Sequence, residues 1–159
     1  MADDNGTNNA EVFVYTERAE IPHDVVRVRV HPSVTVIPER AFDYRKKLEE
    51  VELCEGLLEI HNRAFMHCTL TRIKIPSTVT RIFWGFFQCR QLEEVELCEG
   101  ITNVDVRAFS ETKIKRIKIP STVTQISFYA FANCILLDDV ELCDGLQDIY
   151  CNALMGVHH

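Results

Sequence analysis

A nine-residue phrase occurs twice in this chain, and its spacing constrains the architecture more than any other feature. Residues 72–80 read Arg-Ile-Lys-Ile-Pro-Ser-Thr-Val-Thr, and residues 116–124 repeat them letter for letter, 44 positions later. A second phrase, Val-Glu-Leu-Cys-Glu/Asp-Gly, begins at Val51, Val95 and Val140 and alternates with the first. The underlying period is therefore about 22 residues. Such a period is typical of solenoids, propellers and repeat arrays.

Each repeat carries apolar residues at fixed positions. Two apolar residues separated by one polar residue form the inward face of a short strand. These pairs are Val28/Val30, Val51/Leu53, Ile73/Ile75, Val95/Leu97, Ile117/Ile119 and Val140/Leu142. An Ala-Phe dipeptide or a variant follows later in each repeat, at Ala41-Phe42, Ala64-Phe65, Phe86-Phe87, Ala108-Phe109, Ala130-Phe131 and Ala153-Leu154. One Phe in most repeats predicts a stacked column of rings in the core.

The combined pattern, L-x-x-V-x-L-P/C-x-x-L-x-x-I-x-x-x-A-F-x-x-C, resembles the BspA-type leucine-rich repeat over roughly residues 25–155. The resemblance implies a leucine-rich-repeat solenoid of six coils that is mainly β. One side would be a parallel sheet, and the other would hold short strands and 3₁₀ or helical turns. The family is associated with protein recognition, often at cell surfaces. The resemblance therefore implies a non-catalytic protein–protein interaction module.

The chain divides into four predicted segments. Residues 1–10 are polar and read as a disordered tail, and residues 11–25 read as a hairpin-like cap. Residues 26–155 hold the six coils, and residues 156–159 are an end without a cap. An uncapped last coil exposes a core layer and a strand edge. Self-association by end-to-end stacking through the open C-terminal coil is therefore the alternative function.

The outward side chains of the six strands alternate in charge from coil to coil. Side chains of a strand point alternately to its two faces, so the two residues between and before each apolar pair face solvent. These residues are Arg27/Arg29, Glu50/Glu52, Arg72/Lys74, Glu94/Glu96, Arg116/Lys118 and Asp139/Glu141. The twelve charges cancel, which leaves little field to attract a partner. We therefore favour a structural ladder, in which every charge has opposite charges on both sides, over a docking surface for a charged ligand.

A second candidate surface follows the second apolar pair of each coil. Aromatic and aliphatic residues gather there in neighbouring coils, at Phe83, Trp84, Val106, Phe128, Tyr129 and Tyr150. Clustered exposed aromatic residues mark interaction sites, so this stripe is a candidate for binding an unidentified protein partner. The same rings could instead fold over the coil edge and fill local gaps. The sequence leaves both interpretations open.

Composition and charge exclude several classes of function. A net charge of −7 and a pI near 5.3 disfavour binding to nucleic acid or to an anionic membrane. Apolar runs are far too short to span a membrane, and the N-terminus shows no signal peptide. A cytoplasmic location is the expectation, in which the seven cysteines stay reduced.

Catalytic and metal-binding motifs are also missing from the sequence. No nucleophile elbow, phosphate-binding loop or dinucleotide-binding glycine run is present. His61, His67 and Cys68 lie near one another without an evident fourth metal ligand. We therefore expect no enzyme activity, no cofactor and no metal site.

Overall fold

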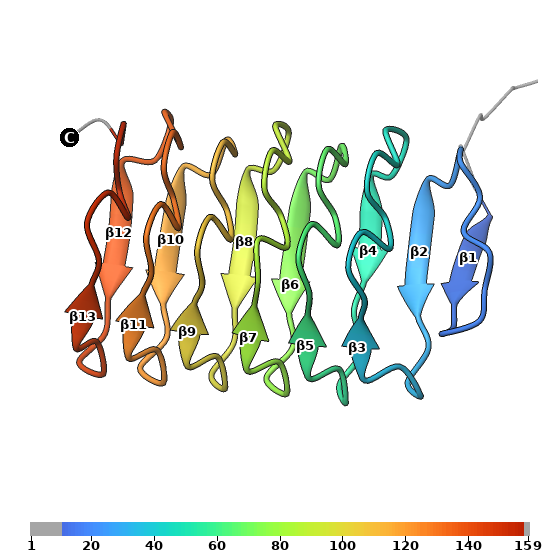
Figure 1. Ribbon diagram of the computed structural model, residues 1–159, viewed down its shortest axis with the longest axis horizontal. Helices are drawn as coiled ribbons and strands as arrows, with labels where there is room; N and C mark the ends of the chain where they lie inside the picture. The colour runs from blue at the N-terminus through green and yellow to red at the C-terminus, as the bar shows by residue number, and fades with distance from the viewer. Residues whose placement is uncertain (1–10, 158–159) are drawn as a thin grey trace, which may run out of the picture.

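The computed structural model describes residues 11–157, which form a β-solenoid of six coils (Figure 1). The predicted tail of residues 1–10 and the last two residues lie outside the described residues. Each coil contributes one longer strand to one side of the solenoid and one short strand to the other. The described residues contain no helix, and turns connect the strands. The predicted leucine-rich-repeat architecture is confirmed.

The short strands form one continuous parallel sheet. Its six strands have two residues each and pair in chain order. They are β3 (Val36–Ile37), β5 (Glu59–Ile60), β7 (Arg81–Ile82), β9 (Asn103–Val104), β11 (Gln125–Ile126) and β13 (Asp148–Ile149). The second residue of each strand through β11 is buried, because it fills the core from this side.

The longer strands, by contrast, are divided into groups. They are β2 (Arg27–Val30), β4 (Glu50–Glu52), β6 (Arg72–Ile75), β8 (Glu94–Leu97), β10 (Arg116–Ile119) and β12 (Asp139–Leu142). Hydrogen bonds join β2 to β4, β6 to β8 and β10 to β12, all in parallel. Figure 1 shows these strands in pairs, with wider spaces between β4 and β6 and between β8 and β10. The structural unit of this side is therefore a pair of coils.

A column of phenylalanine rings fills the centre of the solenoid. Consecutive rings are stacked with centroids 5.0–5.6 Å apart and planes within 10° of parallel. The rings are Phe42, Phe65, Phe86, Phe109 and Phe131, and each has no exposed surface. The prediction assigned Phe86-Phe87 to the Ala-Phe position, which is one residue out of register. Gly85 takes the place of Ala and Phe86 joins the column, whereas Phe87 is only half-buried.

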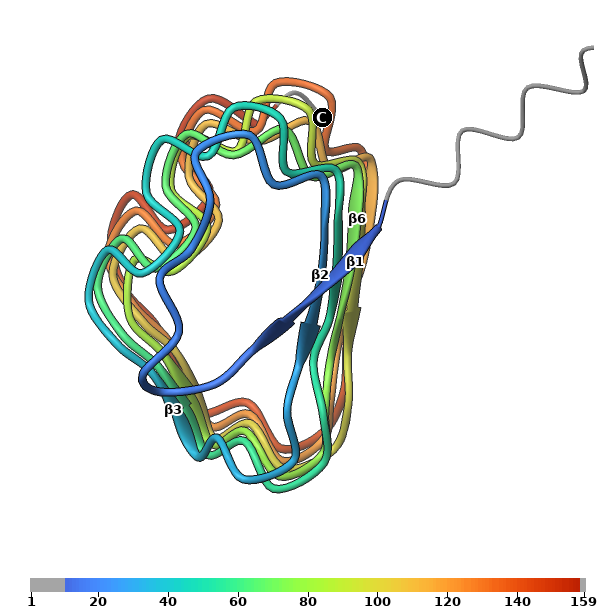
Figure 2. The ribbon, with the colours of Figure 1, turned by 90° about the vertical axis from the view of Figure 1, so that its right-hand side faces the viewer.

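The predicted hairpin at the N-terminus is wrong, because β1 (Val12–Tyr15) pairs with β2 in parallel. Figure 2 shows β1 crossing obliquely over the end of the first coil. Residues 16–26 carry the chain back, so both strands run in the same direction. Tyr15 is buried, and its ring packs edge-on against Phe42 at 5.1 Å. The crossing places this ring over the end of the phenylalanine column, and so β1 covers the core.

The sixth coil leaves apolar side chains open to solvent. Leu142 is 48% exposed and Ile149 is 47% exposed. Their counterparts inside the solenoid, such as Leu97 at 8% and Ile126 at 1%, are covered by the next coil. Strands β12 and β13 accordingly lie at the edges of their sheets.

Candidate functional site

The charge alternation extends beyond the strands to whole coils. Residues 70–91 contain four basic and no acidic side chains, whereas residues 92–113 contain six acidic and two basic ones. We call the first, third and fifth coils (residues 25–47, 70–91 and 114–136) the basic coils. The second, fourth and sixth (residues 48–69, 92–113 and 137–157) are the acidic coils. Two kinds of interface therefore alternate along the solenoid.

Hydrogen bonds between the longer strands, and ion pairs between the outward side chains of these strands, join each basic coil to the acidic coil that follows it. The register places Lys74 opposite Glu96, and their charged atoms lie 2.6 Å apart. This hydrogen bond to Glu96 raises the pKa of Lys74. The same arrangement joins Arg29 to Glu52 and Lys118 to Glu141 at 2.6 Å, and Arg27 to Glu50 at 3.2 Å.

Turn hydrogen bonds join each acidic coil to the basic coil that follows it. The Thr122 hydroxyl accepts the Gly100 N–H at 3.0 Å and donates to the Ile101 carbonyl at 2.8 Å. The Glu99 carboxylate accepts hydrogen bonds from Ser121 and Thr122, and these bonds lower the pKa of Glu99. Thr78 repeats the threonine contacts with Gly56 and Leu57. The Ser-Thr of one repeated phrase and the Glu-Gly of the other therefore serve this interface.

The predicted charge ladder is consequently interrupted at two places. In residues 11–157, no ion pair joins the outward residues of β4 to those of β6, or those of β8 to those of β10. Four ladder residues, Arg72, Glu94, Arg116 and Asp139, make no ion pair within this range. The expectation that every charge has opposite charges on both sides is therefore wrong. The physical reason is that β4 and β6 share no strand hydrogen bonds, and neither do β8 and β10.

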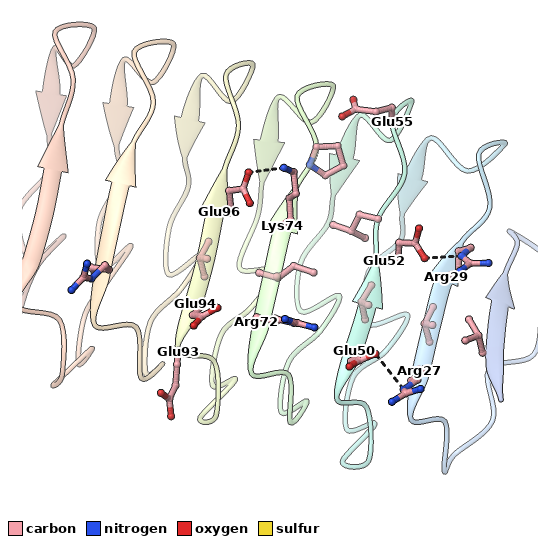
Figure 3. A pocket seen from close by; sticks show the side chains of 18 residues that line it. Arg27, Arg29, Glu50, Glu52, Glu55, Arg72, Lys74, Glu93, Glu94 and Glu96 are labelled. Carbon is pink, nitrogen blue, oxygen red and sulfur yellow. Dashed lines mark hydrogen bonds and ion pairs between the residues drawn. The ribbon is translucent and has the colours of Figure 1, made fainter. Parts of the chain in front are cut away.

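A groove of about 950 Å³ lies over the longer strands from β2 to β8 (Figure 3). Its floor includes Val51 and Leu53 of β4 and the following turn, which are half-buried, whereas Ile73 of β6 is buried. Figure 3 shows Glu52 turned toward β2 and Lys74 turned toward β8, away from the space between β4 and β6. The ion pairs thus draw the charges apart and leave an apolar floor between an acidic and a basic wall.

The predicted aromatic stripe does not form a single column. Phe83 lies under Arg81, whose guanidinium carbon is 4.4 Å from the ring centroid. Phe128 instead packs on Tyr150, with ring centroids 4.8 Å apart. Val106 is half-buried.

Trp84 and Tyr129 belong to a different column, because the third coil is one to two residues shorter at this point. Phe65 and Phe86 are 21 positions apart, and the other core rings are 22 or 23 apart. Trp84 consequently shares a left-handed backbone conformation with residues just before the Ala-Phe position, which are Arg63 at φ 57°, Arg107 at 52° and Tyr129 at 61°. The repeated Arg-Ala-Phe at residues 40–42, 63–65 and 107–109 is the sequence signal for these arginines, and the sequence analysis missed it.

Three of the seven cysteines belong to the core. All seven are free, and Cys68, Cys89 and Cys134 are buried. The Cys89 thiol donates to the Phe65 carbonyl at 2.9 Å, and burial raises its pKa to about 12. A thiol with that pKa is not a nucleophile at neutral pH. Residues 11–157 contain no group of three or more side chains suited to hold a metal ion.

Within the same range, no helix has the length and apolar character needed to cross a membrane.

These repeats, parallel strands and stacked phenylalanines define a leucine-rich-repeat solenoid. The family model described as BspA type leucine rich repeat region matches residues 23–156 in six copies. The chain therefore belongs to the BspA-type leucine-rich-repeat family. A comparison with curated proteins finds no match.

Solved structures of bacterial proteins share the fold. The T. pallidum leucine-rich-repeat protein is 30% identical with a TM-score of 0.70, over 73% of this chain and 56% of that one. A leucine-rich cell surface protein from Faecalibacterium prausnitzii is 26% identical with a TM-score of 0.57, over 74% and 39%. The pneumococcal vaccine antigen PcpA is 19% identical with a TM-score of 0.68, over 74% and 30%. The chain thus spans about a third to a half of these structures.

Proposed function

We propose that this chain is a non-catalytic protein-interaction module whose partner lies in the groove over the longer strands. Leucine-rich-repeat solenoids are typically non-enzymatic, and a protein-binding role is common among such repeats. The observation that carries the proposal is the groove itself. An apolar floor between walls of opposite charge is a surface that a partner segment can fill.

The walls define the chemistry of the partner segment. Glu50, Glu52 and Glu55 line the acidic side of the groove, and Arg72 and Lys74 line the basic side. Of these, Glu55 and Arg72 make no ion pair in residues 11–157, whereas the other three are paired. A segment with charges of one sign is repelled by one wall, so the complementary segment carries an apolar residue between a basic and an acidic one. The charges of the groove largely cancel, and selectivity comes from their pattern rather than from a net field.

Arg72 is the residue with which to test the groove. It lines the basic wall and makes no ion pair in residues 11–157, so its substitution removes no salt bridge described there. Peptides selected from a displayed random library on the unchanged protein should carry both charge signs around an apolar residue. Arg72→Glu should weaken the binding of the selected peptides by about tenfold or more, since it reverses one wall.

A charge-matched control is Lys47→Glu, which changes an exposed cation that does not line the groove. This variant should bind the selected peptides as the unchanged protein does. Hydrogen exchange with the peptide bound should show protection in β4 and β6. Equal losses of binding in both variants, or no enrichment of peptides at all, would contradict the proposal.

Self-association through the sixth coil is a second candidate, favoured by the exposure of Leu142 and Ile149. Charge works against it, because residues 137–157 contain five acidic and no basic side chains. Two such coils placed together repel one another at neutral pH. Light scattering on a size-exclusion column, at several protein concentrations, tests this candidate. A dimer that strengthens with salt supports stacking through this coil, and a monomer throughout excludes it.

A further inference from the structure

Two arginines lie on either side of the single tryptophan of the chain, in the turns that follow the short strands. The Arg63 guanidinium carbon lies 5.6 Å from the Trp84 ring centroid, and that of Arg107 lies 5.7 Å from it. Arg107 also lies 5.3 Å from the Tyr129 ring and 5.7 Å from the Phe87 ring. These distances are those of cation–π contacts. We call Arg63, Trp84, Arg107 and Tyr129 the arginine–aromatic ridge.

The backbone of the ridge does not favour these residue types. All four residues have a positive φ, between 45° and 61°. Glycine and asparagine tolerate this conformation best, and Asn152 occupies the equivalent place in the sixth coil. Bulky side chains are therefore placed where the fold alone would prefer small or amide ones. Every coil from Arg40 to Asn152 shares this conformation at this position, so the backbone of the repeat sets the row in which the ridge residues lie.

The ridge arginines differ from the other arginines nearby in how their charge is balanced. Arg81 forms an ion pair with Asp105, and Arg90 forms one with Glu111. In residues 11–157, Arg63 and Arg107 have neither an ion pair nor a side-chain hydrogen bond. A guanidinium that lies over a ring keeps its in-plane N–H groups available as donors. The cation–π contacts also restrict its motion, so less side-chain entropy is lost when an anion binds.

We propose that the arginine–aromatic ridge is a docking site for an acidic peptide segment. Arg63 and Arg107 lie two coils apart, which corresponds to about 10 Å at the spacing of paired strands. A peptide in the polyproline II conformation has three residues per turn and rises about 9 Å in three residues, so side chains three positions apart lie on one face. Two carboxylates at that spacing can therefore each receive N–H donors from one arginine. This site is separate from the groove and does not depend on the function proposed for it.

Trp84 makes the site directly observable, because it is the only tryptophan. The probe is a short labelled peptide with glutamate at every third position and leucine between, and its control has glutamine in place of glutamate. The acidic peptide should change the Trp84 fluorescence in a saturable way, and the glutamine peptide should not. The net charge of −7 opposes binding of an anion, so any binding must come from local contacts.

Two variants that remove the same charge distinguish binding at the ridge from a response to the overall charge of the protein. Arg107→Gln should weaken the affinity for the acidic peptide by about tenfold or more, since a charge-assisted hydrogen bond is lost. The fluorescence anisotropy of the labelled peptide measures this affinity. Arg90→Gln removes the same charge from an arginine outside the ridge and should leave the affinity unchanged. Arg72→Glu in the groove should also leave it unchanged. Circular dichroism verifies that each variant is folded.

Several outcomes overturn the proposal. The first is an unchanged Trp84 fluorescence spectrum at acidic-peptide concentrations up to about 1 mM, which would mean that the dissociation constant is weaker than about 1 mM. Equal losses of affinity in Arg107→Gln and Arg90→Gln would show that the peptide senses only overall charge. Tighter binding of a single-stranded oligonucleotide than of the acidic peptide would identify the ridge as a phosphate or base-stacking site instead.

Discussion

Gly100 and Gly56 offer a matched test of how the coils pack. Both lie in the Glu-Gly turn of an acidic coil, and both have a positive φ, 131° and 103°. A Cβ atom on Gly100 would lie 1.8 Å from the Ser77 carbonyl oxygen of the preceding coil. A Cβ atom on Gly56 would lie 3.6 Å from its nearest neighbour, the Pro32 carbonyl oxygen. Alanine at Gly100 must therefore displace backbone, and alanine at Gly56 need not.

The difference between the two alanine variants can be estimated. Positive φ imposes a similar strain of about 1–3 kcal/mol at both sites. Gly100→Ala adds an overpacking cost of about 1–3 kcal/mol, because two backbone segments must separate. We therefore expect Gly100→Ala to lower the free energy of unfolding by about 2 kcal/mol more than Gly56→Ala. For a chain of this size, the corresponding difference in melting temperature is about 4–8 °C.

Urea and thermal unfolding followed by circular dichroism measure this difference. Hydrogen exchange should show faster exchange in β8 of Gly100→Ala, because the strained turn follows that strand. Repeat proteins are stabilised by contacts between neighbouring coils, so the loosening should concentrate at this interface. Equal destabilisation by the two substitutions would refute the reasoning, since it would mean that the contact with Ser77 relaxes freely.

Three further predictions follow from the contacts between coils. Lys74→Glu replaces an ion pair between β6 and β8 with like charges, and should lower the melting temperature in low salt and less so in high salt. Hydrogen bonds from Ser121 lower the pKa of Glu99 in the folded state. The stability that these bonds contribute is therefore present above pH 4.5 and is lost as the pH falls through the lowered pKa. Glu99→Gln should make the free energy of unfolding depend less on pH in that range. Among the free thiols, Cys151 is exposed and should react with a thiol reagent at pH 8, whereas Cys89, with its pKa of about 12, should react only after unfolding.

Each of these three predictions has a control. Lys47→Glu makes the same charge change at an exposed residue that forms no ion pair in residues 11–157, and it should leave the melting temperature nearly unchanged. Glu11→Gln removes an exposed carboxylate that makes no ion pair in that range, and acid unfolding should follow that of the unchanged protein. Cys89→Ser should leave the fast-reacting thiol count unchanged, whereas Cys151→Ser should reduce it. Salt-independent destabilisation by Lys74→Glu, or an unaltered acid transition in Glu99→Gln, would contradict the contacts described.

The sequence by itself determined the coil, its core and its alternation. Apolar residues at Ile73 and Ile75, and the Phe at the end of most repeats, recur at fixed intervals. Such a pattern buries one face of every strand only when coils stack in register. The alternation of two phrases likewise predicts two kinds of coil. These properties depend on the order of residues within one repeat, which is written directly in the chain.

Only the tertiary structure decided which neighbours meet across the coils. The joining of strands two by two, the parallel crossing of β1 and the enclosure of Trp84 by Arg63 and Arg107 depend on distances between side chains in different coils. A shorter third coil shifts Trp84 by one position relative to its neighbours, and that shift moves it from one column to another. Periodicity fixes what each coil contains, but the spacing and register of stacked coils determine which charges pair and which remain available to a partner.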